Sequence, residues 1–358
     1  MIKPYRLAVF FGGCSSEYSV SLQSAYAVLR NINKARFQAI PIGISKSGEW
    51  FFFRGNTEKI RQDRWLNQAD CTPCVLSPSR ENHRLLLLRE GKTESIPVDL
   101  AFPVLHGKNG EDGTVQGLIE LAGIPLVGCG VLASALCMDK DRAHILAAAA
   151  GADIPHSSVF FRTDSIEKIR MFADRIGFPL FVKPVRSGSS YGITRVTSPD
   201  QLPEAVALAF RHDGRILLEE NIEGFEVGCA VLGDEQLTTG QVDEIELAGG
   251  FFDFTEKYTL QTSAIHVPAR IPPEKAEEIK QTAKKIYRAL GCSGFARVDL
   301  FVTPQGRIVF NEVNTIPGFT EHSRYPGMMK AAGISFGELL SRMLEHTLKT
   351  GTERNGSV

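Results

Sequence analysis

The sequence predicts a mixed α/β fold of more than one domain, beginning with a parallel α/β unit. Three observations predict it. Apolar strands and helices alternate over about the first 130 residues, a glycine- and serine-rich loop joins two strand-like runs within 179–196, and two more strand-like runs flank a turn within 295–314. The 358 residues also exceed one ordinary core, so we expect two or three domains.

The composition argues against several classes of protein. Hydrophobic residues make up 43% of the chain and charged residues 23%, as in a globular protein. A net charge of −1 gives no general attraction to nucleic acid or to an anionic membrane. The apolar runs are too short to span a bilayer, and the first residues lack the apolar region of a signal peptide. Seven scattered cysteines favour a reducing compartment, so we expect a cytoplasmic protein.

The first unit is predicted from its alternating elements. These are strand 7–11, helix 20–29, strand 98–104, helix 114–122 and strand 125–127. Such alternation predicts an open, largely parallel sheet that binds ligands at the carboxyl ends of its strands. Two polar loops, 12–19 and 106–113, follow such ends. His106 in the second loop is the best histidine candidate for an anion contact, and a loop-capping imidazole is the equal alternative.

The second unit centres on the loop 186–192. A helix predicted over 133–150 precedes the strands and the loop of this unit. Lys183 lies in an apolar run just before the loop and needs an anionic partner, because unpaired burial of a charge is costly. The backbone N–H groups of the loop are suited to phosphate, and Lys140 offers a second cation; a plain flexible hairpin is the alternative. Further on, Glu219 and Glu226 flank a predicted bend, where one of them could meet ribose hydroxyls.

The runs 295–302 and 307–314 predict a hairpin with a metal site. A two-residue loop at Gln305-Gly306 would set Asp299 opposite Glu312 and Arg297 opposite Asn314. Two carboxylates and an amide oxygen suit Mg²⁺ that carries nucleotide phosphates. A three-residue loop would shift this register, and a solvated hairpin face is the alternative.

The remaining segments predict a cover and two helices. Residues 248–268 are loop-like but rich in Phe and Tyr, which is typical of a mobile segment that covers a site. Helices are expected over 274–289 and 335–348, and the tail 351–358 is expected to fray.

Taken together, these pieces resemble the ATP-grasp family and, within it, the D-alanine–D-alanine ligase group. The matching stretches are GGCSSEYSVS (12–21), LHGKNGEDGTVQG (105–117), MDK (138–140), VKPVRSGSSYG (182–192), LEENIEGFEV (218–227), FTEKY (254–258), ARVDLF (296–301) and FNEVNTIPGFTEHSRYP (310–326). The resemblance implies a three-domain ATP-grasp ligase. Its domains would be 1–132 with the first D-amino acid site, 133–225 as the central subdomain, and 226–350 with the magnesium and acceptor sites.

The resemblance also implies roles for single residues. Lys140, Lys183, Ser190 and Lys257 would bind the ATP phosphates, Glu219, Glu220 and Ile222 would line the adenine through backbone groups, and Glu226 would bind the ribose. Asp299, Glu312 and Asn314 would bind two Mg²⁺ ions, for which Mn²⁺ is a possible substitute. Glu17 would bind the ammonium of the first D-alanine, in a hydrogen-bonded triad with Ser189 and Tyr258. His106 would lie near the carboxylate of that D-alanine. Arg297 and the backbone of Gly318 would stabilise the oxyanion of the tetrahedral intermediate. A homodimer is also implied.

The acceptor site departs from the usual pattern of the group. Typical D-alanine–D-alanine ligases carry His-Ser-Leu where this chain has His322-Ser323-Arg324, and an arginine there resembles the D-alanine–D-serine ligases of vancomycin resistance. Arg324 would bring donors or ordered water to a serine hydroxyl, and a site built to bond a hydroxyl rejects the methyl analogue. We therefore predict a D-alanine–D-serine ligase. The alternatives are an ordinary D-alanine–D-alanine ligase, a surface position for Arg324, and a non-catalytic nucleotide-binding regulator.

Overall fold

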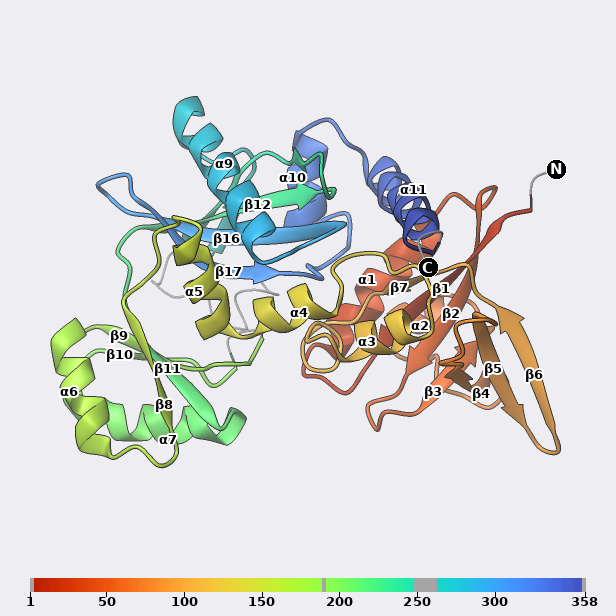
Figure 1. The fold of residues 1–358 in the computed structure, drawn as a ribbon, viewed down its shortest axis with the longest axis horizontal. Coiled ribbons are helices and arrows are strands. Elements are labelled where there is room, and N and C mark those ends of the chain that lie inside the picture. The colour runs from red at the N-terminus through yellow and green to blue at the C-terminus, as the bar shows by residue number, and fades with distance from the viewer. Residues whose placement is uncertain (1–2, 189–190, 248–262, 356–358) are drawn as a thin grey trace.

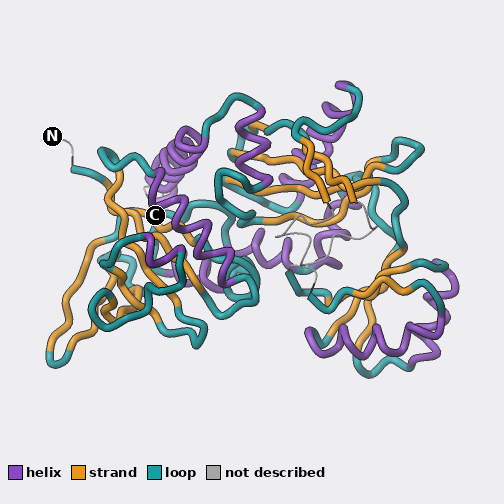
Figure 2. Tube along the Cα trace, turned by 180° about the vertical axis from the view of Figure 1, so that it is seen from behind, coloured by secondary structure: helices purple, strands orange, loops and turns teal. Residues whose placement is uncertain are grey.

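Three β-sheets organise the computed structural model, which describes residues 3–188, 191–247 and 263–355. The N-terminal sheet lies at the right of Figure 1, the small central sheet at the lower left, and the C-terminal sheet above and between them. Helices α4 (Val131–Met138) and α5 (Lys140–Ala149) run between the N-terminal sheet and the other two, as both views show (Figures 1 and 2). No described helix is long and apolar enough to cross a membrane.

The N-terminal sheet has seven strands in the order β6-β5-β4-β3-β2-β1-β7. Strand β1 (Tyr5–Gly12) pairs in parallel with β2 (Phe37–Ile44) and β7 (Leu100–Pro103). The other strands are antiparallel: β3 (Trp50–Phe53), β4 (Cys71–Leu76), β5 (Arg84–Arg89) and β6 (Lys92–Pro97). The prediction of a largely parallel sheet is therefore wrong for strands β3 to β6. Parallel neighbours need a crossover of a dozen or more residues, and β5 and β6 are joined by only two.

The two predicted ligand loops leave neighbouring strands. One loop runs from β1 into α1 (Tyr18–Asn31), and the other runs from β7 into α3 (Thr114–Leu121). The short helix α2 (Glu58–Arg61) packs against α1. The hydroxyl of Ser15 donates to the carbonyl of His106 at 2.7 Å, so the loops touch. The expected strand 125–127 makes only a single bridge, between Ala101 and Leu126.

The helix predicted over 133–150 is two helices, because Asp139 is extended (φ −91°, ψ 98°). Its side chain accepts from the backbone N–H of Arg142 at 3.2 Å and caps α5. Lys140 is therefore the first residue of α5, and it is buried. The break lets the chain turn at the residue that carries this cation.

The central sheet is antiparallel in the order β10-β9-β11-β8. Its strands are β8 (Ser157–Phe161), β9 (Leu180–Pro184), β10 (Thr194–Val196) and β11 (Arg215–Glu220), and its helices are α6 (Ile166–Ile176), η1 (Pro199–Gln201) and α7 (Leu202–His212). The pairing of β9 with β10 confirms the predicted strand–loop–strand arrangement around 186–192.

The C-terminal sheet has the order β15-β14-β12-β16-β17, with β13 paired to β12. Its strands are β12 (Phe225–Leu232), β13 (Thr238–Thr239), β14 (Asp243–Leu247), β15 (Ser263–His266), β16 (Phe295–Val302) and β17 (Ile308–Asn314). The helices are α9 (Pro273–Ala289), α10 (Arg324–Ala331) and α11 (Phe336–Asn355). Helix α11 continues to Asn355 and so takes in residues 351–355 of the tail that is expected to fray.

A β-bulge decides the register of the β16–β17 hairpin. The N–H of Thr303 donates to the carbonyl of Arg307 at 3.0 Å, so the loop has three residues and the two-residue prediction is wrong. Asp299 nevertheless faces Glu312, whereas Leu300 faces Phe310, because the register shifts between these pairs. The bulge adds one residue to β17 and restores the pairing that the longer loop would have lost. The predicted facing pairs, Asp299 with Glu312 and Arg297 with Asn314, are confirmed.

One apolar core joins the N-terminal and C-terminal sheets. The ring of Phe102 on β7 lies 6.0 Å from that of Phe295 on β16 and 6.0 Å from that of Phe319, and all three are buried. Burying rings of this size against each other favours one fixed placement of the two sheets. The site between them therefore has rigid walls on two sides.

Candidate active site

A cavity of about 630 Å³ lies where the N-terminal loops, α5 and the C-terminal sheet meet. Its lining includes the predicted residues Glu17, His106, Lys140, Arg297, Glu312, Asn314, Gly318, Ser323 and Arg324. Residues that are far apart in the sequence thus line the same cavity. The predicted residues Ser189, Ser190, Lys257 and Tyr258, and most of the predicted cover, lie outside the described residues.

Glu17 is held between the two N-terminal loops. It is buried directly before α1, where its N–H donates to the hydroxyl of Ser15 at 3.1 Å. Gly107 in the other loop has φ +71°, and a Cβ there would lie 2.4 Å from Oε2 of Glu17. Only glycine accommodates both the conformation and the close approach. A buried carboxylate in this position is suited to a ligand ammonium.

His106 connects the N-terminal part to the loop after β17. Nδ1 lies 2.8 Å from the carbonyl of Ile316, which can only accept, so Nδ1 carries the hydrogen and Nε2 accepts from Ser24 at 3.2 Å. The hydroxyl of Ser24 in turn accepts from the N–H of Phe319 at 3.0 Å. Burial lowers the pKa of His106, although the Glu17 carboxylate acts in the opposite direction. The imidazole is therefore neutral at pH 7 and bonds at both nitrogens.

Acidification is expected to destabilise the protein through His106. Its folded pKa lies below the unfolded value of about 6.5, so the unfolded state takes up the proton first. The contribution of His106 to stability is complete at pH values above its unfolded pKa. This contribution is lost as the pH falls from the unfolded pKa toward the folded pKa. Melting temperatures of wild type and His106→Asn between pH 7.5 and 5.5 test this expectation. The variant should show the shallower decline, and equal slopes would contradict the assignment.

Lys183 finds its predicted anionic partner in Glu219. The ammonium lies 2.5 Å from Oε1 of Glu219 on the adjacent strand β11, and both side chains are buried. Oε2 of the same carboxylate faces Nδ1 of His144 at 3.9 Å. The neighbouring Glu220 accepts from the N–H of His156 at 2.8 Å, and Ile222 follows in the loop after β11. Since Glu219 faces Phe181, which lies on the same side of β9 as Lys183, the buried cation and its carboxylate are fixed on one face of the central sheet.

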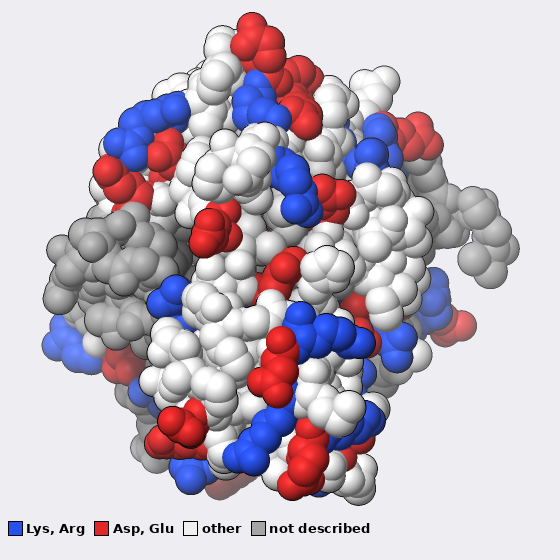
Figure 3. Space-filling view, turned by 90° about the vertical axis from the view of Figure 1, so that its left-hand side faces the viewer, with Lys and Arg blue, Asp and Glu red and all other residues white. Residues whose placement is uncertain are grey.

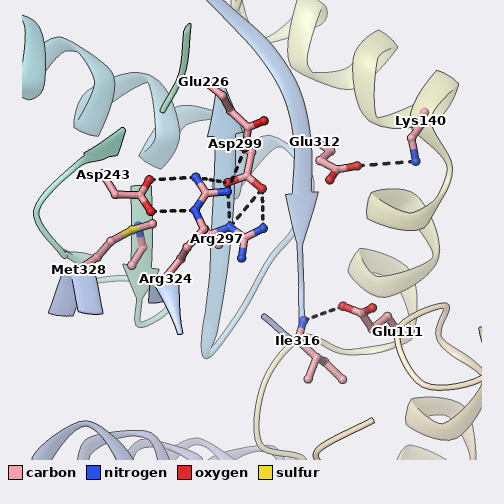
Figure 4. Close-up of polar contacts among 11 residues, drawn as sticks. Glu111, Lys140, Glu226, Asp243, Arg297, Asp299, Glu312, Ile316, Arg324 and Met328 are labelled. Atoms are coloured by element: carbon pink, nitrogen blue, oxygen red, sulfur yellow. Dashed lines mark hydrogen bonds and ion pairs between the residues drawn. The ribbon is translucent and has the colours of Figure 1, made fainter. Parts of the chain in front are cut away.

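Lys140 links the glycine-rich loop to the hairpin. Its ammonium donates to the carbonyl of Ser187 at 2.8 Å and lies 3.6 Å from Oε2 of Glu312 (Figure 4). This cation therefore lies beside both features that the sequence associated with phosphate and metal.

The predicted metal residues lie on two neighbouring strands. Asp299 on β16 is buried and accepts from Arg297 at 2.7 Å, while Glu312 and Asn314 lie on β17 and line the cavity. The described residues contain no group of three or more His, Cys, Asp or Glu that could hold a metal. Two carboxylates and one amide oxygen nevertheless fit Mg²⁺, which completes its shell with phosphate and water.

Arg324 is buried at the start of α10, so the surface alternative is wrong. Its guanidinium donates to Asp243 from Nε at 2.7 Å and from Nη2 at 2.9 Å, and Nη1 donates to Glu226 at 2.9 Å. Asp299 lies 3.4 Å from Nη2. Figure 4 shows the guanidinium among these three carboxylates. Glu226, predicted at the ribose, thus has an ion pair with Arg324, the arginine predicted at the acceptor site.

The sequence did not point to Gly228 or Asp243, which the structure places against the guanidinium of Arg324. Gly228 on β12 pairs with Asp243 on one side and Asp299 on the other. A Cβ there would lie 2.5 Å from Nη2 of Arg324 and 2.6 Å from Oδ1 of Asp243. The missing side chain therefore makes room for the guanidinium. A glycine inside a strand pattern is a signal for such a close approach.

Glu111 is the third missed residue. Its Oε2 accepts from the N–H of Gly107 at 2.6 Å, and its Oε1 accepts from the N–H of Ile316 at 3.2 Å. Burial and the nearby Glu17 raise the pKa of Glu111 to about 8, against the effect of these two N–H groups. An acid in the glycine-rich stretch GKNGEDG was the available signal.

Charges on the outer face in Figure 3 are interspersed, with basic and acidic side chains alternating over the surface. This face offers no single-sign patch of the kind that binds nucleic acid.

Comparisons with known proteins agree with this geometry. Residues 6–129 match the family model for the D-ala D-ala ligase N-terminus, and residues 146–345 match that for the C-terminus. The crystal structure of VanG D-Ala:D-Ser ligase from Enterococcus faecalis is similar with a TM-score of 0.90 and 54% identity, covering 96% of this chain and 100% of that one. Vancomycin B-type resistance protein VanB of Enterococcus faecalis is 46% identical over 344 residues, 95% of this chain and 97% of its own.

The D-alanine–D-alanine ligase of Caldicellulosiruptor bescii is 40% identical over 354 residues, 98% of this chain and 96% of its own. Resistance ligases and an ordinary ligase are thus similar to this chain at comparable identity. With both family models matched, the chain belongs to the D-alanine–D-alanine ligase family and is an ATP-dependent ligase that forms a peptide bond.

Proposed function

We propose that this ligase joins D-alanine to D-serine. The observation that supports it best is the buried guanidinium of Arg324, which lines the cavity beside Ser323 and is held by carboxylates from three strands. The likeness to the crystal structure of VanG D-Ala:D-Ser ligase supports the same acceptor.

The hydrogen-bond inventory of Arg324 explains how a hydroxyl would be recognised. A guanidinium has five N–H donors. Asp243 takes one from Nε and one from Nη2, and Glu226 takes one from Nη1. The second donor on Nη2 faces Asp299 at 3.4 Å. This leaves one donor, on Nη1, for a serine hydroxyl or for a water that bridges to it. D-alanine would leave that buried donor without a partner, which is how such sites reject the methyl analogue.

The proposed reaction proceeds in two steps. The carboxylate of D-alanine, with its ammonium at Glu17, takes the γ-phosphoryl group of ATP and becomes an acylphosphate while ADP forms. The amine of D-serine, after losing a proton, then attacks the acyl carbon, the new C–N bond forms and phosphate leaves. Lys140 and Lys183 would stabilise the phosphates, and Arg297 and the N–H of Gly318 the oxyanion.

Magnesium would be held by Asp299, Glu312 and Asn314, and it would supply positive charge to the transferring phosphoryl group. The roles given to Ser189, Ser190, Lys257 and Tyr258, the adenine contacts of Glu219, Glu220 and Ile222, the ribose contact of Glu226, two metal ions, a cytoplasmic location and a homodimer stay predictions. The products would enter modified peptidoglycan precursors, in line with the resistance proteins among the relatives.

Phosphate release at pH 7 tests the proposal. D-alanine with D-serine should release phosphate at least about tenfold faster than D-alanine alone, which corresponds to the roughly 1.4 kcal/mol of one lost hydrogen bond. Equal rates would make this an ordinary D-alanine–D-alanine ligase. The absence of any amino-acid-dependent ADP formation would favour a nucleotide-binding regulator.

Gly228→Ala is expected to disturb acceptor choice although no charged residue is replaced. The added methyl would lie 2.5 Å from Nη2 of Arg324 and must displace the guanidinium. We expect a loss of about 1–3 kcal/mol in unfolding free energy, as overpacking costs in a core, and a fall in the D-serine to D-alanine ratio of kcat/KM. Gly327→Ala is the matched control, since a Cβ there meets nothing within 4 Å. An unchanged ratio in Gly228→Ala would contradict the role given to Arg324.

A further inference from the structure

Glu111 connects the N-terminal loop to the strand that carries the predicted metal ligands. Its Oε2 bonds the N–H of Gly107 within its own loop, while its Oε1 reaches the N–H of Ile316, more than two hundred residues away. Figure 4 shows this carboxylate beside the end of β17. Glu111 lines the same cavity as Glu312 and Asn314. It is nevertheless absent from the roles assigned above.

The amide of Asn314 has only one orientation that satisfies its neighbours. One of its terminal atoms lies 2.8 Å from Oε1 of Glu111 and 3.2 Å from the carbonyl of Ile316. The carbonyl of Ile316 can only accept, so the atom between them must be the amide nitrogen. The amide oxygen then lies on the opposite side of the group and has no competitor from Glu111.

We propose that Glu111 is a positioning residue that fixes the amide of Asn314 with its oxygen available to the metal. The inference rests on the proposed function. Ligand residues are generally oriented by such outer partners, whose loss weakens metal binding about 10- to 100-fold. Because Glu111 belongs to the loop of His106 and Gly107, the same bond connects the first-substrate loop to the metal ligands. Loop placement and metal affinity are thereby coupled.

Exchanging the hydrogen-bond donor and acceptor between Glu111 and Asn314 tests the proposed orientation of the Asn314 amide. In Glu111→Gln, the N–H of Gly107 at 2.6 Å requires the glutamine oxygen on its side. The glutamine NH₂ then faces both the NH₂ of Asn314 and the N–H of Ile316, and it forces the Asn314 amide to turn. In Asn314→Asp, two carboxylates face each other. In the double variant, the glutamine NH₂ donates to one aspartate oxygen and leaves the other for the metal.

The measurement is the dissociation constant of Mn²⁺ in the presence of ADP, followed by electron paramagnetic resonance. We expect each single variant to bind Mn²⁺ at least about tenfold more weakly than wild type. The double variant should bind Mn²⁺ at least about threefold more tightly than either single variant, a coupling that independent sites do not show. A full return to wild type is not expected, because the glutamine NH₂ still faces the N–H of Ile316. Glu111→Gln with wild-type Mn²⁺ affinity would overturn the proposal. A double variant that binds Mn²⁺ no more tightly than the better of the two single variants would overturn it as well. If a single variant does not fold, a double variant that also fails to fold would overturn it.

Glu345→Gln is the matched control. Glu345 on α11 also bonds to the N-terminal part, to Arg36 just before β2 at 3.0 Å, but on the exposed surface. This variant should keep the Mn²⁺ affinity of wild type. If Glu345→Gln loses as much Mn²⁺ affinity as Glu111→Gln, any weakened contact between the N-terminal and C-terminal parts has the same effect. That result would overturn a specific role for Glu111. Failure of the proposed function looks different, because wild type would then form no ADP with D-amino acids. An active wild type with an indifferent Glu111 contradicts only the positioning role.

Discussion

Arg324→Leu is expected to abolish activity, whereas Arg324→Leu combined with Asp243→Asn is expected to fold and to prefer D-alanine. Removing the guanidinium alone leaves the fully buried carboxylate of Asp243 unpaired beside Glu226 and Asp299. Breaking a buried ion pair from one side costs about 3–5 kcal/mol. Neutralising Asp243 in the same variant removes most of that penalty. A leucine then forms an apolar wall that suits the methyl group of D-alanine.

Thermal melts and kcat/KM for the two acceptors test this expectation. The double variant should recover most of the melting temperature lost by Arg324→Leu, and its D-serine to D-alanine ratio of kcat/KM should fall at least about tenfold below that of wild type. A double variant that folds and retains the wild-type ratio would exclude Arg324 from acceptor choice. A single variant as stable as wild type would contradict the buried ion pairs.

Glu312→Gln is expected to lower kcat by about a hundredfold or more while leaving the fold intact. Charge stabilisation by a metal contributes several kcal/mol to phosphoryl transfer, and each 1.4 kcal/mol is tenfold in rate. The side chain of Glu312 is 26% exposed, and glutamine retains an oxygen for Lys140, so a stability change beyond about 0.5 kcal/mol is not expected.

Glu278→Gln provides the control for Glu312→Gln. Glu278 also pairs with a lysine, Lys275, but it is exposed on α9 and away from the cavity lining. Its variant should keep wild-type kcat and wild-type dependence on Mg²⁺. Full activity of Glu312→Gln at limiting Mg²⁺ would contradict the metal assignment.

The hairpin shows what the sequence could predict. Alternation alone put Asp299 with Arg297 on one face, and the turn placed their partners opposite. The pairing of Asp299 with Glu312 was right although the loop length was wrong, because the β-bulge restored the register. Bulges depend on the fit of the whole sheet and leave little local signal.

The cluster around Arg324 could be predicted only in part. The resemblance pointed to the arginine, but Asp243 and Gly228 come from strands 81 and 96 residues earlier, and their meeting is a tertiary event. The same holds for Glu111 and Ile316. Local patterns also hid the break at Asp139, since a capping side chain within a helical pattern looks like an ordinary polar residue.

Identification of the dipeptide made from equimolar D-alanine and D-serine at pH 7 tests the central claim most directly. Mass spectrometry distinguishes the two products by one oxygen atom. The structure of the acceptor site predicts that D-alanyl-D-serine predominates with wild-type protein, because only serine satisfies the free N–H of Arg324. A product that is mainly D-alanyl-D-alanine would contradict the account.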